Sequence, residues 1–449
     1  MRKITAPIGQ HLVKLIDDLR LRLYDPTFCA RHRIRPQDFT RHRSLPFPVV
    51  LLLILQKTVK SVKRHLDDFL AQLAAESAAV TPGGWTQARA KLKHTAFSEL
   101  NRECVLPAAY PRGPASAPRL WKGHRVLAID SSLVRLPNRP DIAHAFGVIT
   151  VINQTGVTGT AYPEGRVSVL YDVLNRIGLN ARLEPSTVGE VDLAYDHFTH
   201  FAKRDLTLVD RGFTGYGLLA HFIQANRDVV ARCSTSSFLA AQELFRLNQA
   251  GQSIRVQLWA PADQRAALRA LGLPLQIVVR FVSLRLSTGE LEVLVTTLLN
   301  ETIYPTAEFH ELYHYRWGIE TYYGDLKGRL DLENFSGLTA EAVRQDFHAA
   351  VLLCNLESLL TGPASQTLTD HRSQCKYPQQ VNRADAFHAL KTHVIEMLYS
   401  TPTIAVVRKL QQLFLSNPVS VRKERIVPRR KPSSCRSYHF QRRVKKIVF

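Results

Sequence analysis

Two short aliphatic runs that each end in an aspartate constrain the fold of this chain most strongly. The runs are Arg125–Asp130 and Leu206–Asp210, and both have the composition of buried strands. Aspartate is rare inside strands and costly to bury, so a single one more often marks only the turn after a strand. Two such ends together predict an α/β protein with a site for a hard cation, since carboxylate oxygens suit Mg²⁺. A third ligand should come from elsewhere in the chain.

The spacing of apolar residues predicts helices near both ends of the chain and strands in the middle. Helical spacing is found over residues 8–24, 47–74, 85–93, 189–203, 306–330, 339–361, 383–399 and 402–415. Strand-like runs are found over residues 125–130, 167–174, 178–184, 206–210 and 228–233. A further β-rich stretch spans 235–305, and the proline-rich residues 108–118 are typical of a linker.

Positive charge is concentrated at the two ends of the chain. The sequence holds 59 lysines and arginines against 38 aspartates and glutamates, a formal net charge of +21. Residues 1–115 and 421–449 each carry +10 of this excess, whereas residues 116–420 carry +1. Basic ends predict a polyanionic partner, most simply nucleic acid. The alternative for the tail is a solvated, disordered end, which is compatible with phosphate contact because such tails often order on binding.

Several classes of protein are excluded by the sequence. The longest purely apolar run, Val49–Leu55, is far shorter than the roughly 20 residues of a transmembrane helix, and the first residues lack the pattern of a signal peptide. The 6 cysteines include no Cys-x-x-Cys pair, which argues against a zinc ribbon and a disulfide framework. We therefore expect a cytoplasmic protein without a membrane partner.

The helix predicted over 306–330 carries an unusual polar stripe. At about 100° per residue, Tyr313, Arg316, Glu320 and Lys327 fall on one face roughly 60° wide. Large aromatic residues frame the stripe and leave little of it fully exposed, which favours a functional face. The alternative is a solvated face on which Arg316 and Glu320 form an i,i+4 ion pair.

The same four residues carry a family resemblance. Tyr313-x-x-Arg316-x-x-x-Glu320 followed by Lys327 resembles the tyrosine–arginine–glutamate–lysine signature of DDE transposases of bacterial insertion sequences, in insertion-sequence family four. The resemblance extends over about residues 120–335, because two upstream segments also resemble the family.

These two segments surround the aspartates that end the aliphatic runs. Asp130, followed by Ser-Ser and then by Leu-Pro, resembles the family's first aspartate, and Asp210, followed by Arg-Gly-Phe, resembles its second. The spacing of 80 residues, then 110 to Glu320 with a β-rich stretch before it, also fits. Ser131 stands where glycine is common and Asn138 where aspartate is common, and neither change removes a proposed ligand.

The resemblance implies an RNase H-like catalytic core and metal-dependent cut-and-paste transposition. Asp130, Asp210 and Glu320 would be the catalytic carboxylates and would hold two Mg²⁺ ions, for which Mn²⁺ can substitute. They would support hydrolytic cleavage at the transposon ends and strand transfer of the 3′-OH into target DNA. The partners implied are the terminal inverted repeats, the target DNA and a second copy of the chain in a synaptic homodimer. The expected location is the bacterial cytoplasm, associated with the nucleoid.

The domains expected on this basis follow the predicted elements. They are a helical DNA-binding domain at 1–115, the first part of the RNase H-like core at 120–234, a β-rich insertion subdomain at 235–305, the second part of the core with the catalytic helix at 306–362, and a helical C-terminal region with a basic tail at 363–449.

Two groups of residues are expected to contact DNA. The resemblance assigns phosphate contacts to Tyr313, Arg316 and Lys327, and Arg211 could contact the backbone or only pair with its neighbouring aspartate. The predicted helix 85–93 is the candidate for recognising the inverted repeat, through Trp85, Arg89 and Lys93. The alternative for this helix is simple packing. The resemblance also implies an aromatic in the β-rich stretch that stacks a flipped base, and the place of its single indole, Trp259, stays open.

A competing motif lies in the same predicted helix. His310-Glu311-x-x-His314 matches the zinc-peptidase signature of two histidine ligands and a general-base glutamate. This alternative, a zinc metallopeptidase, leaves Asp130, Asp210 and both basic ends unexplained. A catalytically dead DNA-binding derivative is a third class, and the presence of all three carboxylates argues against it.

Overall fold

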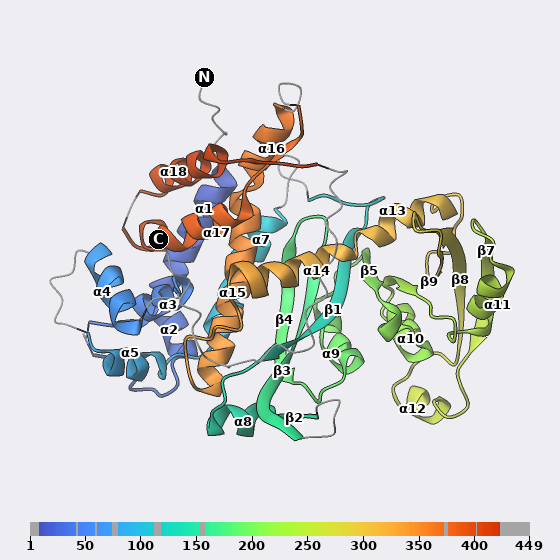
Figure 1. Ribbon diagram of the computed structural model, residues 1–449, viewed down its shortest axis with the longest axis horizontal. Coiled ribbons are helices and arrows are strands. Elements are labelled where there is room, and N and C mark those ends of the chain that lie inside the picture. The colour runs from blue at the N-terminus through green and yellow to red at the C-terminus, as the bar shows by residue number, and fades with distance from the viewer. Residues whose placement is uncertain are drawn as a thin grey trace. The chain divides into compact units, whose positions relative to one another are not determined.

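The computed structural model describes residues 9–41, 44–58, 61–73, 80–111, 118–152, 158–371, 376–400 and 402–422 (Figure 1). The chain divides into two compact units. Unit 1 contains Met1–Ala117, Val134–Gly165 and Asp325–Phe449, and unit 2 contains Pro118–Leu133 and Arg166–Gly324. The basic tail predicted at 421–449 falls, beyond Arg422, outside the described residues. No helix in the described part of the chain is both long and apolar enough to cross a membrane.

Unit 2 is built on a mixed sheet whose central strands are parallel. The strands are β1 (Arg125–Arg135), β3 (Thr158–Asp172), β4 (Ile177–Pro185), β5 (Asp205–Val209), β6 (Asp228–Arg232), β7 (Ser253–Trp259), β8 (Gln276–Arg285) and β9 (Leu291–Thr296). They lie in the order β3-β1-β5-β6-β9-β8-β7, with β4 paired to β3. β1, β5 and β6 are parallel, whereas β9, β8 and β7 pair antiparallel. The predicted strands are therefore present, and β1 continues past the aspartate at 130.

The strands of the predicted insertion continue this sheet. β9 pairs with β6 over Val230↔Thr296 to Arg232↔Leu294, and the whole of 235–305 belongs to unit 2. The stretch is β-rich as expected, but it does not form a separate subdomain, because its strands bury their apolar sides in the same core. This core contains Val230, Val282 and Leu294.

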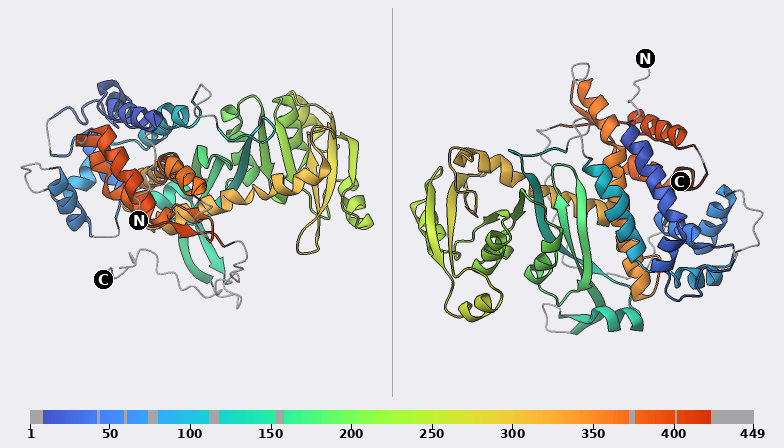
Figure 2. Two further views of the ribbon diagram at one scale, coloured as in Figure 1. Left: turned by 90° about the horizontal axis from the view of Figure 1, so that it is seen from above. Right: turned by 180° about the vertical axis from the view of Figure 1, so that it is seen from behind.

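Short helices accompany the sheet of unit 2. They are α9 (Glu190–Asp196), α10 (Tyr216–Gln224), α11 (Leu239–Leu247), α12 (Arg265–Ala270), α13 (Phe309–His314) and α14 (Trp317–Gly324). In Figures 1 and 2, α13 and α14 follow one another past β1 and β5. Phe309 and Leu312 of α13 are fully buried in the same core as Val126 and Leu208 of these strands.

Unit 1 is mainly helical and draws on both ends of the chain. Its helices are α1 (Gln10–Leu23), α2 (Pro26–His32), α3 (Phe47–Leu55), α4 (Val62–Gln72), α5 (Pro82–Arg89), α6 (Thr95–Leu100), α7 (Leu106–Ala109), α8 (Pro140–Phe146), α15 (Ala340–Leu360), α16 (Gly362–Asp370), α17 (Arg383–Thr392) and α18 (Thr403–Ser416). Among its described residues, unit 1 also contains three π-helical segments, Asn101–Val105, Asp325–Arg329 and Glu396–Ser400. β2 (Val148–Ile152) pairs with the first half of β3, and β10 (Gln379–Gln380) pairs with β11 (Val419–Ser420).

Helices from the two ends of the chain pack on one another in unit 1. The guanidinium of Arg20, on α1, donates to the carbonyl oxygens of Met397 at 2.8 Å and Glu396 at 3.0 Å. α15 is buried along most of its length and packs against α3, α6 and α17. The residues predicted as an N-terminal domain therefore share a core with the C-terminal helices.

Two predicted helices of unit 1 differ in their ends. The helix expected over 47–74 is divided into α3 and α4. α5 begins at Pro82, before the predicted start at residue 85, because the Thr81 hydroxyl accepts a hydrogen bond from the Gly84 N–H at 3.1 Å and proline is favourable in the first turn. α5 ends at Arg89, so Lys93 is not part of it.

Candidate active site

Asp130 and Asp210 lie level with each other on neighbouring parallel strands. β1 pairs with β5 from Arg125↔Asp205 to Ala128↔Leu208, a constant offset of 80 residues, and two further residues along each strand reach the two aspartates. Asp130 lies within β1, which continues to Arg135, and Asp210 directly follows β5. Both side chains are half-buried. The 80-residue spacing in the sequence is therefore the register of the sheet.

The segment that carries Glu320 is fixed to both strands by tyrosine hydroxyls. The Tyr313 hydroxyl donates to the carbonyl oxygen of Val209, the residue before Asp210, at 3.1 Å. The Tyr323 hydroxyl donates to the carbonyl oxygen of Asp130 itself at 2.6 Å. Glu320 is between the two anchors in the chain. Tyr323 is not among the site residues expected from the sequence, since an aromatic on a helix is usually a packing residue.

The helix predicted over 306–330 is broken in the middle. α13 ends at His314 and α14 begins at Trp317. Between them, the N–H groups of Tyr315 and Arg316 bond to carbonyls three residues back, at 3.2 and 3.1 Å, as in a 3₁₀-turn. The projection at 100° per residue therefore does not hold across this turn. Lys327 lies beyond α14, on the π-helical segment Asp325–Arg329 of unit 1, where burial lowers the pKa of its ammonium.

Arg316 interacts electrostatically with all three predicted carboxylates. Its Nη2 donates to Glu320 Oε1 at 3.0 Å, the i,i+4 pair considered above. Its charge lowers the pKa of Asp130, and Asp210 in turn raises the pKa of the guanidinium. The side chain is only 4% exposed, and its Nε has no hydrogen-bond partner among the described residues. A buried guanidinium with an unused donor is suited to bind a further anion.

The environment of Asp130 is short of positive charge. Burial raises the pKa of its carboxyl to about 6, and the nearby carboxylates of Glu190 and Glu320 raise it too, against the lowering effects of the Ser131 N–H and Arg316. The Ser131 N–H donates to Asp130 Oδ1 at 2.8 Å. A hard divalent cation would relieve this repulsion, so the donor set fits a metal such as Mg²⁺.

The three carboxylates are not assembled into a metal cage as they stand. Among the described residues, no group of three histidine, cysteine, aspartate or glutamate side chains is close enough to hold a metal ion. The Glu320 carboxylate is paired with Arg316 at 3.0 Å. To join Asp130 and Asp210, it must exchange this partner.

Two further carboxylates near the site have no sequence signature. Glu190, at the start of α9, accepts from the Ser131 hydroxyl at 2.6 Å and from Arg166 Nη1 at 2.5 Å. Glu292, on β9, is buried, and burial raises the pKa of its carboxyl although Arg232 Nε lies 3.3 Å away. Both glutamates lie near the aspartates only in the folded protein. No local spacing in the sequence predicts this proximity.

The phosphate-contacting residues expected from the sequence are differently exposed. Tyr313 is 3% exposed and its hydroxyl is already bound to the backbone of β5, so it anchors the helix instead of facing solvent. Arg211, directly after Asp210, is exposed and forms no ion pair with any described residue, including its neighbour. It remains a candidate for contact with the DNA backbone.

The structure corrects the predicted roles of Trp85 and Arg89. Trp85 is buried on α5, and Arg89, 4% exposed, is fully engaged inside unit 1. The Arg89 guanidinium donates to Asp346 at 2.7 Å and to Gln345 at 2.8 Å, both on α15. A buried arginine with these partners holds α5 on α15 and is not available to DNA. Arg89 and Lys93 also share no helix face, because α5 ends before Lys93.

A basic surface lies next to these residues, at a short β-bridge. The segment 31–35 (Arg-His-Arg-Ile-Arg) pairs with 91–93 (Lys-Leu-Lys) through Ile34 N–H to Lys91 O and Lys93 N–H to His32 O, each at 2.8 Å. The surface, here called the basic bridge, comprises Arg33, Arg35, Arg41, Lys91 and Lys93. None of its five cations forms an ion pair with a described residue, and Arg41 and Lys91 also line a groove of about 560 Å³.

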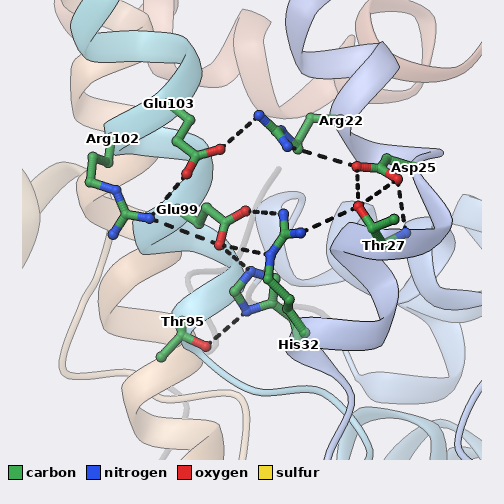
Figure 3. A network of polar contacts seen from close by, with 9 residues as sticks. Arg22, Asp25, Thr27, His32, Thr95, Glu99, Arg102 and Glu103 are labelled. Carbon is green, nitrogen blue, oxygen red and sulfur yellow. Dashed lines mark hydrogen bonds and ion pairs between the residues drawn. The ribbon is translucent and has the colours of Figure 1, made fainter.

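A buried polar network fixes the first strand of the basic bridge (Figure 3). His32 Nε2 lies 2.9 Å from Glu99 Oε2, and its Nδ1 lies 2.9 Å from the Thr95 hydroxyl. Arg31 Nη2 donates to the other Glu99 oxygen at 2.5 Å. His32 and Glu99 are both buried. The backbone of segment 31–35 is therefore held against α6 by this network. The neighbouring cations of the basic bridge are not part of the network.

The zinc-peptidase residues do not form a peptidase site. His310, Glu311 and His314 are all exposed on α13, and the Glu311 carboxylate accepts a hydrogen bond from the Tyr315 hydroxyl at 2.7 Å. No third metal ligand accompanies them among the described residues. Trp259, whose place the sequence left open, is 62% exposed at the end of β7, the last strand of the sheet.

Comparisons with known proteins show which family the chain belongs to. A family model described as the transposase DDE domain matches residues 121–356, which include Asp130, Asp210 and Glu320. The chain is similar to the transposase InsG of insertion sequence element IS4 from Escherichia coli K12, with 23% identity over 367 residues, 78% of this chain and 79% of the relative. It also resembles a cryo-EM structure of the piggyBac transposase synaptic complex with hairpin DNA, with a TM-score of 0.43 and 10% identity, over 92% of this chain and 88% of that one.

Proposed function

We propose a mechanism for this site on the premise that the chain belongs to the DDE transposase family. Members of this family are DNA transposases, and so is this chain. Enzymes of this family act on DNA by metal-dependent phosphoryl transfer. We propose that the core of unit 2 is an RNase H-like fold, with Asp130 on its first strand and Asp210 after its fourth. The strand order β4-β3-β1-β5-β6, with its three parallel central strands, supports this assignment.

Asp130, Asp210 and Glu320 are the catalytic carboxylates in this proposal. They would hold Mg²⁺, or Mn²⁺ in its place, with two ions per site. The observation that carries the assignment is the level position of Asp130 and Asp210 in the β1–β5 register, with Glu320 on a segment hydrogen-bonded to both strands. When bound, the metal would activate the attacking water or 3′-hydroxyl and stabilise the leaving oxygen of each phosphoryl transfer.

Arg316 has two roles in succession. Without metal its guanidinium neutralises the carboxylates and holds Glu320. If Glu320 bound a metal, the Arg316 guanidinium would lose this carboxylate partner and would be able to hold a phosphate oxygen next to the scissile bond. The unused Nε donor and the burial of the side chain support this exchange. Arg211 and Lys327 supply further positive charge for the DNA backbone.

The basic bridge holds the transposon end in this proposal. Its cations are unpaired, and they lie on two segments whose backbones are joined by hydrogen bonds. Lys93 keeps the role expected from the sequence, while Arg33, Arg35, Arg41 and Lys91 replace Trp85 and Arg89. Phosphate contacts of this kind position a protein on a duplex without reading its sequence. Because a reaction at two ends needs two sites, we propose that a homodimer forms the synaptic complex, acting on DNA in the nucleoid.

Strand cleavage on a DNA that carries the terminal inverted repeats tests the proposal. In Mg²⁺, the wild-type chain is expected to nick and cut at the ends. Asp130→Ala, Asp210→Ala and Glu320→Ala are expected to bind the ends with unchanged affinity and to leave the strands intact. His310→Ala is the matched control on the exposed side of α13 and is expected to cut normally. Normal cutting by Glu320→Ala would show that the metal assignment is wrong.

A further inference from the structure

The hydroxyl of Tyr323 binds the main chain at Asp130. It donates to the carbonyl oxygen of Asp130 on β1 at 2.6 Å. Main-chain carbonyls within a strand normally accept hydrogen bonds from the N–H groups of a neighbouring strand. Here a side chain from α14 also bonds to the β1 main chain, at the residue proposed as a metal ligand.

The backbone of Asp130 is consequently positioned by the helix and not by the sheet alone. Tyr323 is 6% exposed, so water does not replace its hydroxyl as a partner. Gly318, on the same helix, approaches the chain after β3, since a Cβ atom there would lie 3.4 Å from the Val173 side chain. α14 thus has little freedom to move relative to β1 and β3. Glu320 is on this helix, three residues before Tyr323.

Tyr313 makes a matching contact on the other aspartate strand. Its hydroxyl bonds to the Val209 carbonyl, directly before Asp210, at 3.1 Å. The two tyrosines flank Glu320 in the chain, and each holds the backbone at one aspartate. Neither hydroxyl reaches the carboxylates themselves in the hydrogen bonds described, so their effect on the carboxylates is indirect.

We propose that Tyr323 is a positioning residue that couples the metal ligand Asp130 to the metal ligand Glu320. Its hydroxyl sets the place of the Asp130 main chain relative to α14, and thereby the spacing of two carboxylates that must reach one metal site. Tyr313 sets the place of Asp210 in the same way. The inference rests on the proposed function, because it takes these carboxylates as the metal ligands.

The consequence is a selective loss of metal affinity. Tyr323→Phe keeps the ring and its packing but leaves the Asp130 carbonyl without its hydroxyl partner. The β1 backbone can then shift. Loss of a residue that orients a metal ligand typically weakens metal binding by about 10- to 100-fold. DNA-end binding is expected to stay unchanged, because the hydroxyl is buried and the basic bridge lies in unit 1.

Titration of the full-length chain with Mn²⁺ in the absence of DNA, followed by electron paramagnetic resonance of the free ion, tests this coupling. Tyr323→Phe is expected to bind Mn²⁺ at least tenfold more weakly than wild type, and to recover cleavage when Mn²⁺ is raised by the same factor. Tyr315→Phe is the matched control, since it removes a surface hydroxyl bonded to Glu311 and should bind Mn²⁺ normally. Asp130→Ala should lose binding.

The outcomes separate the two claims. Unchanged Mn²⁺ affinity in Tyr323→Phe, with binding lost in Asp130→Ala, would overturn the inference and leave the proposed function intact. Unchanged affinity in Asp130→Ala would overturn the proposed function itself. Loss of the cooperative thermal transition in Tyr323→Phe would show that the hydroxyl serves folding and would also overturn the inference. Tyr313→Phe provides the second variant, with the same tenfold loss expected.

Discussion

A buried histidine beside the catalytic strands makes the stability of unit 2 sensitive to acid. His197 lies between β3 and β4, with Nε2 3.0 Å from the Ser168 hydroxyl and Nδ1 2.8 Å from Asn180 Oδ1. Burial, together with the smaller effects of the charges of His200 and Arg182, lowers the pKa of its imidazole from 6.5 to about 3. The folded protein therefore keeps His197 neutral at pH values where the unfolded chain protonates it.

The sign and size of the effect follow from this difference in pKa. Below pH 6.5 the unfolded chain binds a proton that the folded state does not, so His197 contributes stability that is complete above pH 6.5 and lost as the pH falls towards 3. The loss is about 1.4 kcal/mol per pH unit in this window. Between pH 7 and pH 4.5, the free energy of unfolding should decrease by roughly 2–3 kcal/mol because of this residue.

Urea unfolding of wild type and His197→Gln at several pH values isolates this contribution. The carboxylates titrate in both proteins, so the difference between the two curves reports the histidine. We expect His197→Gln to be less stable than wild type at pH 7, and the gap to narrow by about 2–3 kcal/mol at pH 4.5. His314→Gln, at an exposed position, should leave the pH dependence unchanged. Parallel curves for wild type and His197→Gln would refute the reasoning.

Three further predictions concern charged residues. Arg89→Ala should lower the free energy of unfolding by about 3–5 kcal/mol, because it leaves the buried Asp346 carboxylate unpaired, and should not change the salt dependence of DNA binding; a stability near wild type would contradict the buried pairing. The double variant Arg35→Ala, Lys91→Ala should weaken DNA binding and reduce the magnitude of the slope of log affinity against log salt concentration by about two, as measured by fluorescence anisotropy. An unchanged slope would show that the basic bridge does not contact DNA. Arg316→Ala should bind Mn²⁺ at least as tightly as wild type, because Glu320 no longer pairs with Arg316, while end cleavage falls by at least about 100-fold. Weaker Mn²⁺ binding would contradict the proposal that Glu320 exchanges Arg316 for the metal.

The strands and their aspartates could be predicted because their signals are local. An aliphatic run that ends in aspartate needs no distant partner to be recognised, and the 80-residue spacing of Asp130 and Asp210 matches the register of β1 on β5. The i,i+4 pair of Arg316 and Glu320 was also visible, as the alternative to a functional face. In the structure the Arg316 guanidinium is buried and the Glu320 carboxylate is partly exposed, so the ion pair and the functional face involve the same contact.

The remainder depends on contacts between distant segments. Arg89 has the sequence environment of a surface helix, and only its bonds to α15, more than 250 residues away in the chain, show that it is buried. His197 similarly has the environment of a polar helix face, yet it is enclosed by β3 and β4. The turn between α13 and α14 contains no proline or glycine at its break, so local propensity does not predict it. The break is accompanied instead by hydrogen bonds from Tyr313 and Tyr323 to two strands.

A change in metal specificity tests most directly whether these carboxylates bind the catalytic metal. Cysteine at position 130 replaces a hard oxygen ligand with a soft thiolate, which binds Mg²⁺ poorly and thiophilic ions well. The measurement is strand cleavage at the transposon end by Asp130→Cys in Mg²⁺ and in Mn²⁺ with a trace of Cd²⁺. We predict no cleavage in Mg²⁺ and recovery with the thiophilic ions, whereas Asp130→Ala recovers with neither. Wild-type cleavage by Asp130→Cys in Mg²⁺, or equal inactivity of both variants in every metal, would contradict direct coordination.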